Sequence, residues 1–126
     1  MRRLFGLTLL ALLYMAAPAA AQAPAVPADS FGWDEAAPSL AAANAYIYEA
    51  EIDNVVRTPA LTAVCTGAVS PFFCKAPIPA VTPAAHTVRI RASEVVNGQT
   101  LVSAFSTPLS FLMRAIPSTP ANVRIV

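Results

Sequence analysis

Alternation of apolar and polar residues with a period of two is the dominant pattern along this chain. It is clearest in residues 87–92, which read T-V-R-I-R-A, and in residues 45–53, which read A-Y-I-Y-E-A-E-I-D. Successive side chains of a strand point to opposite faces of a sheet, so each run predicts a strand with one buried face. The second run ends in Asp53-Asn54, a pair with turn-forming chemistry.

Turn-forming residues divide the rest of the chain into further short segments. Asn97-Gly98, which lies between apolar runs, is the strongest short-range signal for a β-hairpin. No stretch has convincing helical periodicity, and residues 34–44, with Pro38 and an alanine run, predict a loop or one short helical turn. The pattern as a whole predicts an all-β chain of about six or seven short strands. The remaining extended segments are predicted at 31–33, 58–66, 72–76, 101–114 with a break at Pro108, and 122–126.

Residues 1–21 have the three-part pattern of a secretory signal peptide. Arg2 and Arg3 precede the apolar residues 4–15, and small residues follow as far as Ala21. The apolar run is shorter than the roughly 20 residues that a spanning helix needs, so cleavage after Ala21 is favoured over a membrane anchor. We therefore expect an exported chain, secreted or periplasmic, with no membrane span after cleavage.

The composition fits one small domain and argues against several classes of function. The chain has 126 residues, and removal of Arg2 and Arg3 with the leader changes the formal net charge from +1 to −1. That balance provides no basic stripe or patch for nucleic acid. Two cysteines and one histidine are too few for a zinc site of four such ligands, and there is no glycine-rich phosphate loop or nucleophile elbow. We expect no catalytic site, no metal and no cofactor.

Cys65 and Cys74 are the best candidates for covalent chemistry. Paired cysteines in an exported chain are expected to be oxidised, so we predict a disulfide that joins the strands on either side of loop 67–71. Closing a loop of about ten residues stabilises a fold by roughly 2.5–3 kcal/mol in the chain-entropy model. The alternative is a redox-active pair, but redox sites of the C-x-x-C kind have two residues between the cysteines, and here there are eight.

Several short motifs follow one another along the chain: Trp33, Tyr46–Glu49, Val81-Thr82-Pro83, His86–Ala92, Asn97-Gly98 and Ser106–Phe111. Together they resemble a fibronectin type III domain. That family has a tryptophan on an early strand, a tyrosine-bearing strand, a Leu-x-Pro-Gly turn before a V-x-V-x-A strand, and a Ser-x-Pro before the last strand. The resemblance covers residues 31–115 and implies an immunoglobulin-like antiparallel β-sandwich of about seven strands.

The resemblance divides the chain after the leader into three parts. Residues 22–30, rich in alanine and proline, predict a linker, and residues 31–115 form the domain. Residues 116–126 predict a C-terminal tail or final strand. That strand belongs either to this sandwich, in place of a weak first strand, or to a following module.

The resemblance also implies positions for charged residues. His86 stands where the family has a tyrosine that bonds back to the preceding turn, so a histidine ring takes the place of the tyrosine corner. In the family's topology the strand that carries Glu49 and Glu51 lies beside the strand that carries Arg89 and Arg91. We therefore predict a cross-strand cluster of these four charges on the outer face of one sheet.

Loops at the ends of a sandwich are the usual place for binding residues, and they direct the functional prediction here. The candidates are the Asn97-Gly98 turn, Val95-Val96, and the loop edge Ser70-Pro71-Phe72-Phe73. Because Phe72 and Phe73 are adjacent, one of the two side chains points out of the core, where it is either a contact point or covered by a loop.

For the function of the chain we expect a non-catalytic exported module that binds a protein or a cell surface, or acts as a spacer. The alternative is a carbohydrate- or cell-wall-binding module whose partner is a surface glycan. Such a module needs exposed aromatics, whereas we expect Trp33 to be a core anchor.

Overall fold

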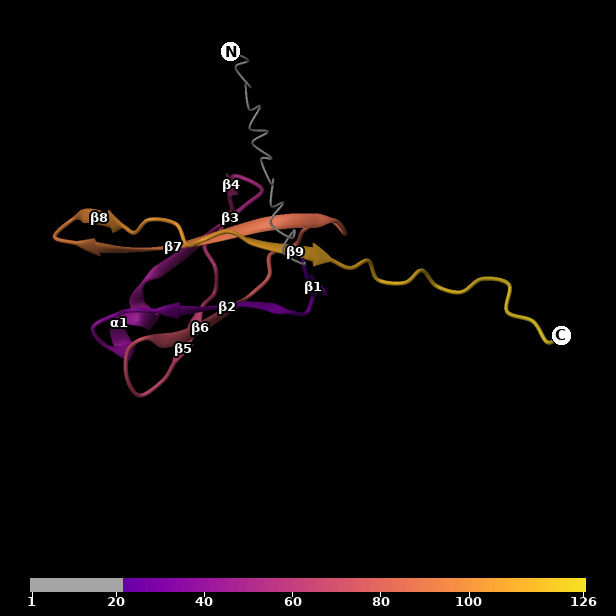
Figure 1. Cartoon of the computed structure of the whole chain (residues 1–126), viewed down its shortest axis with the longest axis horizontal. Helices are drawn as coiled ribbons and strands as arrows, with labels where there is room; N and C mark the ends of the chain where they lie inside the picture. Colours follow the sequence, from indigo (N-terminus) through magenta and orange to yellow (C-terminus); the bar gives the residue numbers. More distant parts are fainter. Residues whose placement is uncertain (1–21) are drawn as a thin grey trace, which may run out of the picture.

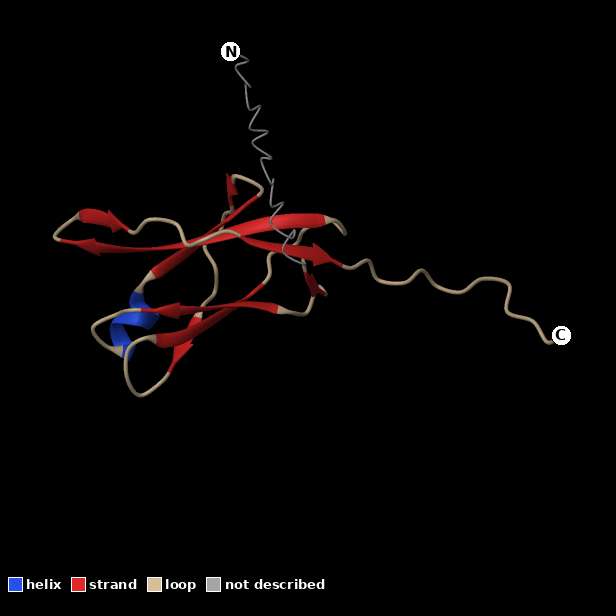
Figure 2. Cartoon of the chain, viewed as in Figure 1, coloured by secondary structure: helices blue, strands red, loops and turns tan. Residues whose placement is uncertain are grey.

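A computed structural model describes residues 22–126, and the predicted signal peptide lies outside them (Figure 1). The described residues form short strands and one short helix (Figure 2). In chain order these are β1 (Ala23–Ala25), β2 (Ser30–Glu35), α1 (Leu40–Ala45), β3 (Ile47–Ile52), β4 (Val55–Val56), β5 (Val64–Thr66), β6 (Phe72–Pro77), β7 (Ala85–Val96), β8 (Gln99–Val102) and β9 (Leu109–Met113). None of the described helical segments is long and apolar enough to cross a membrane.

The strands form two sheets that lie one above the other (Figure 1). The larger sheet has the order β1-β9-β7-β3-β4, and β8 pairs with the distal half of β7. The smaller sheet has the order β2-β6-β5, with antiparallel pairing throughout. The described chain is therefore mostly β, as the alternating pattern predicted, and its strands form two sheets, as expected for a β-sandwich.

The facing sides of the two sheets supply the core, because the alternating apolar residues of each strand point inward. Around β9, the core contains Phe31, Ile52, Val88, Phe111 and Met113, which are all buried. Phe31 from the smaller sheet meets Phe111 from the larger one edge to face, with ring centroids 5.4 Å apart. Such an aromatic pair contributes about 0.5–1.5 kcal/mol beyond the burial of its area, so it joins the two layers at this end.

A second group of buried residues fills the other end of the core, next to α1. Its members are Ala37, Ala43, Tyr48, Cys65, Phe72, Cys74 and Ala92. Trp33 is partly buried and packs against both groups, and its ring centroid lies 5.0 Å from that of Tyr48. The prediction of Trp33 as a residue packed on the core is thus confirmed.

Four predicted segments are strands as expected, and the hairpin lies where its turn signal placed it. These are the strands around 31–33, 45–53, 72–76 and 87–92, although β7 continues to Val96. Asn97 and Gly98 have φ angles of 50° and 78°, and two successive positive φ values are what a tight turn between β7 and β8 requires. The return segment is interrupted between β8 and β9, before Leu109, as Pro108 predicted.

Three segments differ from the sequence-based expectation. Within 58–66 only Val64–Thr66 is a strand, and Leu61 makes a single bridge to Tyr48. Pro59 has no N–H to donate, and the chain bends there, so no ladder forms before Leu61. Residues 23–25, predicted as part of a linker, instead form β1 parallel to β9. Residues 122–126 form no strand.

The strand β1 exists because small residues fit beside β9. Ala25 is buried, and its carbonyl accepts a hydrogen bond of 2.8 Å from the N–H of Arg114. A turn follows at once, in which Asp29 accepts a hydrogen bond from the N–H of Val26 at 2.9 Å. The chain then crosses to the smaller sheet as β2.

Candidate functional site

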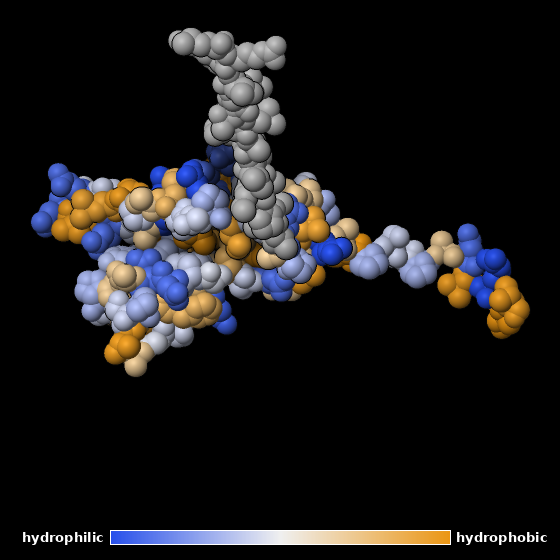
Figure 3. Space-filling model, viewed as in Figure 1, coloured by the Kyte–Doolittle hydropathy of each residue, from blue (hydrophilic) through white to orange (hydrophobic). Residues whose placement is uncertain are grey.

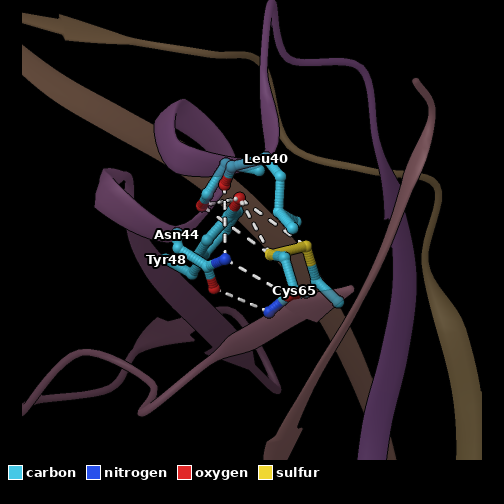
Figure 4. Close-up of a disulfide and its surroundings, with 6 residues drawn as sticks. Leu40, Asn44, Tyr48 and Cys65 are labelled. Carbon is cyan, nitrogen blue, oxygen red and sulfur yellow. Dashed lines mark hydrogen bonds between the residues drawn. A yellow bond between two sulfur atoms is a disulfide. The ribbon is translucent and has the colours of Figure 1, made fainter. Parts of the chain in front are cut away.

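The predicted disulfide between Cys65 and Cys74 is present and joins β5 to β6 (Figure 4). The two cysteines are directly opposite each other in the ladder, and both are buried. The described residues contain no free cysteine. Tyr48 lies against both sulfur atoms, with its Oη 3.7 Å and 3.8 Å away, and donates a hydrogen bond of 2.8 Å to the carbonyl of Ala43. Burial, with smaller contributions from Glu35 and Tyr46, raises the pKa of Tyr48 to about 12.

The helix α1 holds Asn44 against the outer edge of β5 (Figure 4). Its side-chain amide donates to the carbonyl of Cys65 at 3.2 Å and accepts from the N–H of the same residue at 2.8 Å. It also donates to the carbonyl of Leu40 at 3.2 Å. Asn44 therefore occupies the place that a neighbouring strand would take.

The sequence of residues 34–44 is compatible with a loop or a helical turn, and the structure shows a helix at Leu40–Ala45. Asn44 is not among the site residues predicted from the sequence. The local signal for the helix is Ser39, whose hydroxyl accepts a hydrogen bond of 3.1 Å from the N–H of Ala42 as an N-cap. No local pattern indicates that Asn44 contacts Cys65, which is 21 residues away in sequence.

His86 makes the corner contact that the resemblance implied, and a second contact besides. Its Nε2 lies 2.8 Å from the carbonyl oxygen of Thr82, and its Nδ1 lies 2.6 Å from Oδ2 of Asp53. Asp53 also accepts a hydrogen bond of 3.0 Å from the N–H of Thr87. The ring therefore links the turn before β7 to the turn between β3 and β4.

The two partners of His86 favour its charged form, because both are acceptors and an imidazolium donates from both nitrogens. The hydrogen bond to Asp53, and then that to Thr82, raise the pKa of His86 above its ordinary value. The hydrogen bond from His86 lowers the pKa of Asp53 in turn. Because both ring nitrogens already have partners in this structure, the geometry gives His86 a structural role rather than that of a general base.

The predicted cluster of charges on the outer face of the larger sheet is confirmed. Glu49 is opposite Arg91 and Glu51 is opposite Arg89 in the ladder. Arg89 donates from Nε to Glu51 at 3.0 Å, and Arg91 donates from Nε to Glu49 at 3.2 Å. The ring of Phe105 covers both guanidinium groups, with centroid distances of 4.5 Å and 4.7 Å. These partly exposed pairs neutralise the face and contribute about 0.2–1 kcal/mol each.

The candidate binding residues Phe72 and Phe73 point in opposite directions. Phe72 is buried in the core beside Cys74, whereas half of the Phe73 surface is exposed. Phe73 is not free of contacts, since its ring lies over Gly32 of β2, where an added Cβ would come within 3.0 Å of it. Of the two, only Phe73 is therefore accessible at the surface.

The candidate turn Asn97-Gly98 is the tip of a hairpin that projects beyond the end of the smaller sheet (Figure 1). Apolar residues gather on this hairpin, where Figure 3 shows a cluster of hydrophobic atoms. We call them the hairpin patch: Val95, Val96, Leu101 and Val102, with exposed fractions of 63%, 41%, 51% and 51%. The ladder register places Val95 and Val102 on one face and Val96 and Leu101 on the other, so both faces of the hairpin are apolar.

A cavity of about 260 Å³ opens at the base of the hairpin patch. Leu101 and Val102 form its apolar wall, and Glu35, Glu94 and Tyr46 supply polar groups. Burial raises the pKa of Glu35, and burial followed by the two nearby glutamates raises the pKa of Tyr46. Among residues 22–126, no group of three or more metal-binding side chains is placed to hold a metal ion.

Comparison with protein-family models, with curated proteins and with solved structures finds no match for this chain.

Proposed function

We propose that the protein is an exported, non-catalytic β-sandwich module of the fibronectin type III-like kind that binds a protein partner through its hairpin patch. The proposed fold family is supported by the order of the central strands, in which β7 lies between β3 and β9, and by the motifs at Trp33 and at the His86 corner. Export is supported by the leader pattern of residues 1–21 and by the disulfide, because such bonds persist mainly in oxidising compartments.

The observation that carries the binding proposal is the exposed apolar hairpin. Val95 and Leu101 each leave half or more of their surface to solvent, on a segment that contacts the body of the domain mainly through its base. Burying an apolar side chain of this size contributes about 1.5–3 kcal/mol, so an exposed group of four favours association with another surface. The sequence places these residues beside turn Asn97-Gly98, the candidate loop.

The cavity beside the patch supports a basic contact residue on the partner. Glu35 and Glu94 line it together with Leu101, so it complements a basic side chain flanked by apolar ones. A partner that inserts a lysine or arginine there covers the patch at the same time. The glycan alternative has less support, because Trp33 is partly buried against Tyr48 and does not form an exposed platform.

The test uses the exported protein with one changed residue in the patch. Leu101→Asp keeps the backbone ladder but places a charge in the contact, so we expect the recovery of a stoichiometric partner from the exported fraction to fall at least about tenfold, since 1.4 kcal/mol corresponds to that factor. Glu94→Lys should weaken the same partner if its contact residue is basic. Quantitative affinity capture with mass spectrometry provides the measurement.

Val69→Asp is the matched control. Val69 is also highly exposed and apolar, but it lies in loop 67–71, away from the hairpin patch. The proposal fails if Val69→Asp and Leu101→Asp lose the partner equally. It also fails if purified cell-wall glycan competes for binding while Leu101→Asp has no effect.

A further inference from the structure

The strand β2 leaves one whole edge of its backbone unpaired within the described residues. It pairs with β6 on one side only. The N–H of Ile78 donates to the carbonyl of Asp29 at 3.1 Å, so the backbone groups of Asp29 face the β6 side. In an antiparallel pair every second residue faces the partner, so Phe31, Trp33 and Glu35 also face β6. The N–H and C=O groups of Ser30, Gly32 and Asp34 therefore point away from β6. Such an edge is a template for another strand.

An apolar groove runs along this bare edge, between β2 and the segment that leads into β9. Its first part, about 180 Å³, has Trp33 and Ile90 as apolar walls and the charged residues Asp34, Glu35 and Arg91 at its rim. The next part, about 320 Å³, lies beside Phe31, Trp33 and Leu109, and half of the Leu109 surface is exposed. The Nε1 atom of Trp33 is buried and has no hydrogen-bond partner. The groove thus offers apolar walls next to free backbone groups.

The tail after β9 has the complementary properties. Residues 114–126 form no strand and are exposed, and the segment runs away from the body of the domain (Figure 1). Residues 121–126 read A-N-V-R-I-V, in which Val123 and Ile125 fall on one side of an extended chain and Asn122 and Arg124 on the other. Val123 is 88% exposed and Ile125 is fully exposed, and Figure 3 shows hydrophobic atoms at this end of the tail.

We propose that residues 121–126 of a second copy of this chain add as a strand to the bare edge of β2. The segment matches the six residues of β2 in length. Its Val123 and Ile125 side chains enter the groove against Phe31, Trp33 and Leu109. Its Arg124 side chain lies on the outer face, where β2 presents the exposed carboxylate of Asp34. Main-chain hydrogen bonds supply affinity and alternate side chains supply specificity in this mode of recognition.

The direction of the tail favours a second copy over the same chain. The N–H of Arg114 is bonded to the carbonyl of Ala25 at the far end of β9, and the tail continues outward from there. Pro117 and Pro120 restrict the backbone of the connecting residues and favour an extended course. The contact joins the tail of one copy to the β2 edge of another. Two copies can therefore exchange tails to form a closed dimer, or successive copies can form an open chain.

The first test measures mass by sedimentation velocity on the exported protein from micromolar to millimolar concentration. We expect mass above that of one chain, rising with concentration, and a single-chain mass for the double variant Val123→Asp/Ile125→Asp. These two residues are exposed and belong to neither group of core residues, so the variant should retain the wild-type circular dichroism spectrum and urea midpoint. Val95→Asp, on the hairpin patch, is the control and should leave the mass unchanged.

The second test locates the contact. Asp34→Lys and Arg124→Glu should each weaken self-association about two- to fivefold, the range for an exposed ion pair, and the two together should restore it. Hydrogen exchange should show protection of the Gly32 and Asp34 amides that disappears in the Val123→Asp/Ile125→Asp variant.

Three results overturn the proposal. The first is a single-chain mass at every concentration without protection of the β2 amides. The second is self-association that persists in the tail variant or is lost in Val95→Asp. The third is a single-chain mass with tail-dependent protection, which would show that each chain's own tail occupies its groove.

Discussion

The two edges of the three-stranded sheet differ in how their backbone groups are used. At the β5 edge, Asn44 from α1 bonds both the N–H and the C=O of Cys65, so a side chain replaces the missing neighbour. At the β2 edge, the outward groups of Gly32 and Asp34 have no such partner among the described residues. The same sheet therefore has one edge closed by its own chain and one edge open to pairing. The β2 edge is therefore the one at which pairing with a strand of another chain should be tested.

Reduction of the disulfide should have the largest effect on the difference between the closed β5 edge and the open β2 edge. Because the Cys65–Cys74 bond closes a loop between β5 and β6, its loss should lower the free energy of unfolding by about 2.5–3 kcal/mol. Urea unfolding with and without a phosphine reductant measures the change, and hydrogen exchange should then show faster exchange at β5. A double Cys65→Ser/Cys74→Ser variant should not respond to the reductant. An unchanged urea midpoint on reduction would contradict the prediction.

Asn44→Ala should have the next largest effect, because it opens the closed edge. The substitution leaves the N–H and C=O of Cys65 without their partner and should cost about 1–2 kcal/mol of unfolding free energy. Asn44→Asp keeps the acceptor for the Cys65 N–H and loses the donor, so we expect an intermediate loss. Gln99→Ala, an exposed change on β8, is the control. Equal urea midpoints for Asn44→Ala and the wild type would show that α1 is not needed to close the edge.

A change of pH should have the smallest effect on the difference between the two edges. The titrating pair, His86 and Asp53, belongs to the larger sheet and touches neither β2 nor β5. Hydrogen bonds to Asp53 and Thr82 raise the pKa of His86 above 6.5, so its stabilisation is fully present below pH 6.5 and is lost as the pH rises through the raised value. The hydrogen bond from His86 lowers the pKa of Asp53 below 3.8, so that contribution is present above pH 3.8 and is lost as the pH falls through the lowered value.

The contribution of this pair should therefore be greatest between pH 3.8 and pH 6.5. Urea midpoints measured at mildly acid and mildly alkaline pH should differ in the wild type, with lower stability on the alkaline side. His86→Gln removes the titrating group and should flatten that difference. Whichever of the Gly32 and Cys65 amides exchanges faster at one pH should also exchange faster at the other. A reversal of that order would show that the contacts of His86 control the edges of the smaller sheet.

The parts of the fold that the sequence predicted are those set by local patterns. Period-two alternation located β3 and β7, and Asn97-Gly98 located the hairpin, because each depends on the conformation of a few neighbouring residues. The disulfide was also predictable, since only two cysteines are present. The cluster of Glu49, Glu51, Arg89 and Arg91 followed from the neighbouring strands that the family resemblance implied, whereas the register that pairs Glu49 with Arg91 is known only from the structure.

The parts that the sequence did not predict depend on contacts between distant segments. Asn44 is an ordinary residue near the end of an alanine run, and its role exists only because α1 brings it to Cys65. Residues 23–25 have the composition of a linker, and they become β1 because β9 offers an edge beside them. The contact of His86 with Asp53 joins residues 33 apart in sequence, so the turn motif alone could not indicate it. The sequence therefore located the hairpin that carries the candidate patch, and it did not indicate the contacts at the two edges of the smaller sheet.

The position of Trp33 gives the protein a built-in optical reporter. It is the only tryptophan, and it packs between the two halves of the core, with Tyr48 on one side and the groove beside β2 on the other. Tyr48 in turn touches the disulfide. The emission of a single indole therefore responds both to events at the sulfur atoms and to a side chain that enters the groove, so one spectroscopic signal can follow both edges of the sheet without any added label.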